Sequence, residues 1–138
     1  MPNYWFFLSD PLVYGFDLLF DKGKDVWDGV YGSHAQKYLS QVKKGDRIIG
    51  YHTAPQKAVY ALLEAVSDAY PDPKEKVKTV YVADVKGLRK FAKAVPLQSL
   101  RDDTRLAEMK FLIIPRMAVS PLTSSEYKEI LRLAGEKE

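Results

Sequence analysis

Residues 3–8 read NYWFFL, with four aromatic side chains in succession, and the segment SDP follows at residues 9–11. Aromatic residues favour strands, and an apolar run of this length that stops at a turn is typical of a strand buried on both faces. Asp and Pro in the second segment indicate that turn. We therefore expect residues 3–8 to form a strand in the centre of the fold.

Three further segments have the composition of strands. Residues 47–52 are rich in β-branched and aromatic side chains and precede a turn at residues 54–56. Residues 79–85 alternate between two apolar faces, and residues 111–114 are continuously apolar. Residues 58–69 are ambiguous, because Ala, Leu and Glu favour a helix whereas a hairpin connection to the preceding strand favours an extended chain.

Helices are predicted from apolar spacing and from residues typical of helix ends. Residues 16–20 form a short helix that ends at Gly23, and another follows Ser33, whose hydroxyl can cap its first turn. Near the C-terminus, Thr123 and Glu126 have the spacing of a capping box. Apolar residues then repeat at helical spacing until Gly135. Shorter helical turns are expected at residues 96–100 and 104–109.

The composition indicates one intracellular domain. The chain has 138 residues, of which 46% are hydrophobic, and contains no cysteine. Its longest apolar run, residues 111–115, is too short to cross a membrane, and no export signal is recognisable. The lack of cysteine excludes disulfides and thiolate metal sites. We expect a single domain over residues 1–138, located in the cytoplasm and without a membrane partner.

The charge balance favours an anionic partner only weakly. The chain carries 21 Lys and Arg against 18 Asp and Glu, a net charge of +3. A solvated surface and a nucleic-acid-binding face both produce clusters of basic residues, so charge alone leaves both interpretations open. The basic clusters fall at residues 43–44, 74–78, 86–93 and 110–116.

The strong signatures of catalysis are missing from the sequence. It has no nucleophile elbow, phosphate-binding glycine loop, zinc-protease motif or dinucleotide fingerprint. Ser33 stands beside His34, but sequence neighbours rarely point at each other as a catalytic pair must. Asp21, Asp25 and Asp28 lack the Gly and the closing Glu of a calcium loop. We expect a non-enzymatic protein with no metal and no cofactor.

Several short motifs, in their order and spacing, resemble the EVE domain. They are NYW at 3–5, SDP at 9–11, WDGV at 27–30, GD at 45–46, YHT at 51–53, AYPD at 69–72, VADV at 82–85 and RMAVSPLT at 116–123. The EVE domain belongs to the PUA-like superfamily and is related in fold to the YTH readers of methylated adenine in RNA. The resemblance implies an α+β fold, namely a PUA-like mixed β-barrel surrounded by short helices. It also favours a strand over a helix for residues 58–69.

Two departures from the family pattern fall where a ligand pocket is expected. Leu8 stands at the position of a common Lys, and YGSHAQ at residues 31–36 replaces a more polar RNYQAR. Polar pocket groups select a base by its edges, so these changes affect the identity of the ligand rather than the fold.

The candidate ligand site is centred on the segment after WDGV. Tyr31 is predicted to stack on a base, and Gly32 lets the backbone approach it. Ser33 and Thr53 are predicted to offer hydroxyls to the base edge. Further candidates, some of which have a core role as the alternative, are Trp27, Tyr51, His52, Ser9 and Arg116. Lys37, Lys43 and Lys44, together with Arg116, are candidates for a phosphate-binding rim.

These patterns favour a module that binds DNA or RNA and holds a base, with a modified base as the leading hypothesis. The first alternative is a general RNA-binding PUA-like module that uses its basic rim without a selective pocket. The second is a small-metabolite binder or an enzyme that uses Ser33 or His52. Each hypothesis is compatible with a monomer or an oligomer.

Overall fold

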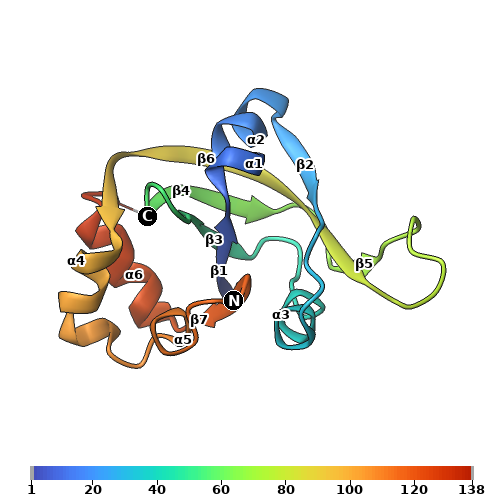
Figure 1. The fold of residues 1–138 in the computed structure, drawn as a ribbon. Coiled ribbons are helices and arrows are strands. Elements are labelled where there is room, and N and C mark those ends of the chain that lie inside the picture. The colour runs from blue at the N-terminus through green and yellow to red at the C-terminus, as the bar shows by residue number, and fades with distance from the viewer. Residues whose placement is uncertain (1, 138) are drawn as a thin grey trace.

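The computed structural model describes residues 2–137 (Figure 1). Its sheet elements are β1 (Tyr4–Ser9), β2 (Lys24–Trp27), β3 (Arg47–His52), β4 (Ala58–Ala65), β5 (Tyr70–Pro71), β6 (Tyr81–Pro96) and β7 (Val119–Leu122). Its helices are α1 (Pro11–Tyr14), α2 (Phe16–Lys22), α3 (Ser33–Leu39), α4 (Leu97–Asp102), α5 (Lys110–Ile113) and α6 (Ser124–Leu133), and the 3-10 turn η1 covers Thr104–Leu106. The strands form one mixed, mainly antiparallel sheet and the helices are short, so the expected α+β class is confirmed.

All strands of residues 2–137 belong to one mixed sheet, in the order β2-β6-β4-β3-β1-β7, with β5 paired to β6. β1 lies inside the sheet, parallel to β3 and antiparallel to β7. The prediction of an interior strand at the N-terminus is therefore confirmed. Helix α3 packs against β6 and β7, and so connects two strands that are far apart in the sheet order.

The side chains of β1 point alternately into two hydrophobic cores, one on each side of the sheet. Trp5 and Phe7 point into the first core, together with Phe16 and Trp27. Phe6 points into the second core, which the C-terminal helix α6 covers. Successive residues of a strand face opposite sides of the sheet, so the aromatic run at residues 4–7 supplies both cores. This is why a strand buried on both faces could be predicted from it.

β6 is much longer than the predicted strand at residues 79–85. It spans 16 residues and pairs with β2, β4 and β5, with irregular register against β4. In its second half only Phe91 and Val95 are buried, and charged or small exposed residues separate them, which hid the strand pattern in the sequence. The ambiguous residues 58–69 form β4 up to Ala65, so the extended alternative is confirmed.

Near the C-terminus one prediction is wrong and one strand was missed. The apolar residues 111–113 belong to the short helix α5 rather than to a strand, and Ile114 is its C-cap; Phe111 is buried and Ile113 exposed. A run of four apolar residues does not distinguish the two states by periodicity. The neighbouring strand is β7, which was missed because Pro121 lowers strand propensity.

The helix ends show one error and one success. Ser33 is the first residue of α3, whose N-cap is Gly32, and no side chain caps this helix. The predicted capping box is present at α6, where Thr123 and Glu126 bond each other's backbone N–H. Within residues 2–137, no helix combines the length and apolar character needed to span a bilayer.

Candidate nucleic-acid-binding site

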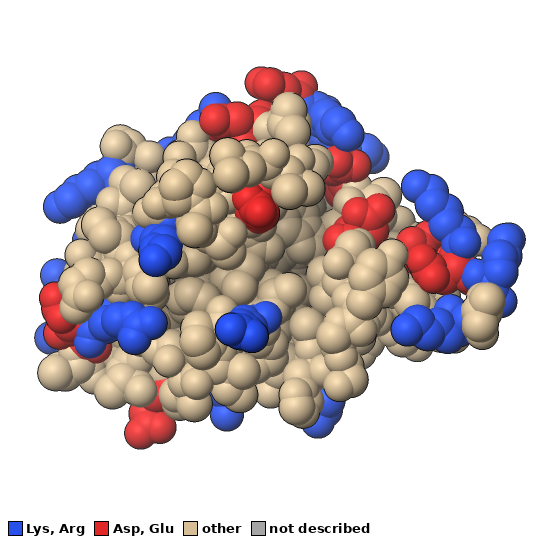
Figure 2. Space-filling model, in the orientation of Figure 1, with Lys and Arg blue, Asp and Glu red and all other residues tan. Residues whose placement is uncertain are grey.

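Two adjoining cavities open where the end of β1, helix α1, the loop between β2 and α3, and the chain before β7 meet. The first has a volume of about 580 Å³ and the second about 460 Å³. Both are lined by Gly29, Val30 and Ala118, so they are neighbouring parts of one depression. Figure 2 shows a hollow near the middle of this face, with acidic side chains above and to the right of it and a basic side chain below.

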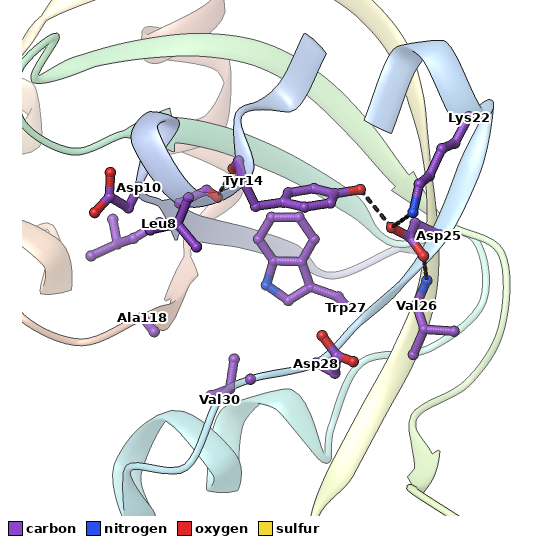
Figure 3. Close-up of a pocket in the computed structure, with 13 residues that line it drawn as sticks. Leu8, Asp10, Tyr14, Lys22, Asp25, Val26, Trp27, Asp28, Val30 and Ala118 are labelled. Atoms are coloured by element: carbon purple, nitrogen blue, oxygen red, sulfur yellow. Dashed lines mark hydrogen bonds and ion pairs between the residues drawn. The ribbon is translucent and has the colours of Figure 1, made fainter. Parts of the chain in front are cut away.

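Trp27 forms the floor of the first cavity. Its side chain is 6% exposed, and its ring stacks on Phe16 with 5.6 Å between centroids and 6° between planes. Tyr14 meets it edge-on from above at 6.0 Å (Figure 3), and Phe7 packs beneath at 5.4 Å. The end of β2 places this residue opposite Ala83 of β6. The floor is thus a fixed aromatic surface within the first core.

Tyr14 and Asp25 form one wall of the first cavity. The Tyr14 hydroxyl donates to Asp25 Oδ2 at 2.6 Å, and Lys22 Nζ lies 3.2 Å from the same oxygen (Figure 3). Burial, followed by the hydrogen bond to Asp25, holds the pKa of Tyr14 well above its usual value. The Ser9 hydroxyl donates to the Tyr14 carbonyl oxygen and so fixes α1 against the end of β1.

The second cavity contains four of the predicted residues: Tyr31, Gly32, Ser33 and Arg116. Tyr31 is 57% exposed, and its hydroxyl donates to Glu75 Oε2 at 3.3 Å. The aromatic face of Tyr31 is therefore open to a ligand, as the stacking hypothesis requires.

Gln36 of α3 holds the loop that both cavities share. Its side-chain amide donates to the carbonyl oxygens of Val30 at 2.6 Å and Tyr81 at 3.0 Å. Its carbonyl oxygen accepts from the Tyr81 backbone N–H at 2.8 Å. These three bonds tie the loop after β2 to strand β6, which gives the cavities a defined shape.

His52 supports the floor from below and does not line either cavity. Its Nε2 accepts from the Phe16 backbone N–H at 2.9 Å, and its Nδ1–H donates to the side-chain carbonyl of Gln56. The ring is 2% exposed and lies between Phe16 and Tyr60. This arrangement requires the neutral form of the imidazole, and burial lowers its pKa.

A consequence of this arrangement is that the protein should lose stability as the pH falls below about 6.5, the pKa of an unfolded histidine. In that range the unfolded chain binds a proton more readily than the folded one, because folding lowers the His52 pKa. Urea unfolding between about pH 7.5 and 5.5 measures the loss. The variant His52→Gln should be less stable at neutral pH and should lack this slope, and an unchanged slope would contradict the assignment.

The remaining predicted residues lie outside both cavities. Tyr51 points into the second core, on the opposite side of the sheet, where it packs against Phe6 and Phe111. The Thr53 backbone N–H donates to the Ser9 carbonyl, so Thr53 positions the end of β1. The predicted rim lysines are exposed, but none lines the cavities, which reach only the start of α3. Lys37 lies in its last turn, and Lys43 and Lys44 follow its C-terminal end.

Sequence reasoning missed several residues of the first cavity. Tyr14, Asp25 and Asp28 all line it, yet Tyr14 was not considered and the two acids were examined only as catalytic or calcium-binding groups. Asp28 belongs to the WDGV motif, which was the available signal. Ala118 belongs to the RMAVSPLT motif at residues 116–123, which was the available signal for it. Within residues 2–137, no group of three or more His, Asp or Glu side chains is arranged to hold a metal ion.

Comparison with known proteins assigns the family. The model of the EVE domain matches residues 3–133, so the chain belongs to the EVE domain family. Thymocyte nuclear protein 1 of Gallus gallus is 26% identical over 135 residues, covering 80% of this chain and 55% of the relative. The relative from Danio rerio is 25% identical and is covered to 58%. The chain thus spans little more than half the length of these relatives.

Solved structures confirm the PUA-like fold. Rpa0253 from Rhodopseudomonas palustris matches with a TM-score of 0.91 and 29% identity, covering 96% of this chain and 93% of that protein. Human THYN1 protein in complex with 5-methylcytosine-containing DNA has a TM-score of 0.83 at 21% identity, with 99% of both chains covered. The YTH domain of Zygosaccharomyces rouxii MRB1, in complex with N6-methyladenosine RNA, has a TM-score of 0.59 at 14% identity and covers 99% and 89%. The expected relationship in fold to YTH domains is confirmed.

Proposed function

We propose that this protein is a non-enzymatic nucleic-acid-binding module that holds one base, and preferentially a modified base, of DNA or RNA in the first cavity. The observation that carries the proposal is the fixed aromatic floor of Trp27, walled by Tyr14, in a cavity of about 580 Å³. That volume lies in the range of about 300–1,000 Å³ common for ligand pockets. Membership in the EVE family and the DNA complex of human THYN1 support the same reading.

The physical argument starts from access to the base. A base in a duplex is stacked and paired, so a protein that reads its whole outline must bind it single-stranded or flipped out. Stacking on an aromatic side chain contributes about 1–3 kcal/mol per base. A methyl group buried in the same cavity adds about 0.8 kcal/mol, a modest preference, so polar contacts must supply further selectivity.

The second cavity suits the neighbouring nucleotide. Tyr31 offers an open ring for a second base, and Arg116 is the basic residue that lines this part of the depression. Arg116 would bind the phosphate between the two nucleotides, since guanidinium groups bind phosphate oxygens through paired donors. Lys37 on the next turn of α3 would extend this contact, whereas Lys43 and Lys44 lie beyond the far end of the helix.

The variant Tyr31→Ala should weaken binding of short single-stranded oligonucleotides about tenfold, because it removes one stacking surface. Fluorescence anisotropy would measure this with DNA and RNA, each either plain or carrying methylated cytosine or adenine. Tyr31→Phe keeps the ring and loses only the exposed bond to Glu75, so it should bind like the wild type.

The outcomes separate the candidate functions. Preference for one modified oligonucleotide would establish a module that reads a modified base. Equal binding of plain and modified forms would contradict the proposed preference for a modified base. Binding that depends steeply on salt but not on Tyr31 would favour a general RNA-binding module, because phosphate contacts release counterions. Absence of binding to every oligonucleotide would refute the proposed function.

A further inference from the structure

The first cavity is lined by three carboxylates, and the structure engages two of them. Asp25 accepts from Tyr14 and Lys22 through one oxygen and from the Val26 backbone N–H at 2.8 Å through the other. Asp10 caps α1 by accepting from the Leu12 backbone N–H at 2.9 Å. The third, Asp28, is exposed and forms no hydrogen bond or ion pair with any part of residues 2–137. Its acceptor oxygens are free to meet a ligand.

The floor of the same cavity carries a free donor. Trp27 is 94% buried, yet its Nε1–H has no hydrogen-bond partner within residues 2–137 and is not enclosed. Figure 3 shows the indole nitrogen turned toward the space between Leu8, Val30 and Ala118. Polar groups of buried residues nearly always have a partner, so a donor left open to a cavity is available to a ligand.

We propose that the first cavity selects a base whose Watson–Crick edge places an amine next to an unprotonated ring nitrogen, namely cytosine or adenine, plain or methylated with one amine hydrogen retained. The amine donates to Asp28, and the ring nitrogen accepts from Trp27 Nε1–H. The base therefore meets the edge of the indole that carries the nitrogen, while one face of the indole stays stacked on Phe16. Thymine and uracil present a carbonyl oxygen where these bases carry the amine, as does guanine. The lone pairs of that oxygen would face the negative carboxylate. This inference rests on the proposed function and names the class of base.

The test uses oligonucleotides of abasic spacers with a single central cytosine, adenine or thymine, measured by competition anisotropy. Wild-type protein should bind the cytosine or adenine probe about tenfold more tightly than the thymine probe. In Asp28→Asn the side-chain amide offers a donor to a carbonyl, so this ratio should fall to within about twofold or reverse. Asp28 has no internal partner, so the fold should be unaffected by the change.

Asp10→Asn is the matched control, because it removes the same charge from the same cavity while Asn still caps α1. Its cytosine-to-thymine ratio should stay at the wild-type value. An equal change in both variants would show an effect of net charge and would overturn the inference. Wild-type binding that depends on Tyr31 but ignores the base would also overturn it and leave the proposed function standing. Absence of all binding would refute both.

Discussion

Replacement of Asp46 by Ala should destabilise the protein by about 3 kcal/mol. Its carboxylate is 2% exposed and accepts three hydrogen bonds: from the Asn3 backbone at 2.9 Å, the Trp5 indole at 2.8 Å and the Lys43 backbone at 2.9 Å. Truncation leaves these donors without an acceptor at the start of β1, where water cannot replace the carboxylate freely. Each unsatisfied buried donor costs about 1–3 kcal/mol, and partial relaxation keeps the total below the sum.

Urea unfolding followed by tryptophan fluorescence measures this loss. Asp46→Asn should fall between the wild type and the Ala variant, since its amide keeps one acceptor oxygen and turns the other into a donor. Asp68→Ala is the matched control, because Asp68 bonds the neighbouring Lys44 N–H at an exposed position. It should cost less than about 1 kcal/mol. An Asp46→Ala loss as small as that of the control would show that the bonds at β1 contribute little.

Gly50→Ala should lower the free energy of unfolding by about 2 kcal/mol. It should also weaken ligand binding, although Gly50 lines neither cavity. A Cβ at this position would lie 2.7 Å from Phe16 Cζ. Phe16 is fully buried between Trp27 and His52, so it cannot turn aside without moving the cavity floor. The free energy of unfolding and oligonucleotide affinity are the two measurements.

Two comparisons isolate this mechanism. Gly87→Ala creates a similar overlap, 2.6 Å from Phe20 Cε1, but Phe20 is only partly buried and can rotate toward solvent. Gly87→Ala should lower the free energy of unfolding by less than half as much as Gly50→Ala, and it should leave ligand binding unchanged. The change Phe16→Leu removes the obstructing ring end, so the double variant with Gly50→Ala should lose less stability than the two single losses added together. Strict additivity would argue against the overlap.

The local features of the fold were largely predictable from the sequence. The aromatic run at residues 4–7 predicted a strand buried on both faces, and the capping box at Thr123 predicted the start of α6. Gly23 ends α2 and Gly45 sits in the turn before β3, and both have positive φ, a conformation that glycine adopts without strain. These features depend on interactions within a few residues, which a single sequence contains in full.

The site was predictable only in part. The segment at residues 31–33 lines the second cavity, as expected, because a compact loop with Gly brings its own neighbours together. Tyr51 was predicted to belong to the same ligand site, yet it lies in the second core. His52, the next residue, lies beneath the floor of the first cavity, against Phe16. Which of two adjacent strand residues faces a cavity depends on the register of the sheet, and pairing partners far along the chain set that register.

The sequence by itself determined the aromatic strand β1, the ends of several helices, the EVE-type motifs and the presence of Trp27 and Tyr31 near Gly29 and Gly32. The tertiary structure alone decided that residues 111–113 become part of a helix, that β7 completes the sheet beside β1, and that Tyr14, Asp25 and Asp28 line one cavity with Trp27. The physical reason is the range of the interactions. Capping, turns and alternation act between near neighbours, whereas strand pairing and cavity walls join segments whose proximity only the packed cores establish.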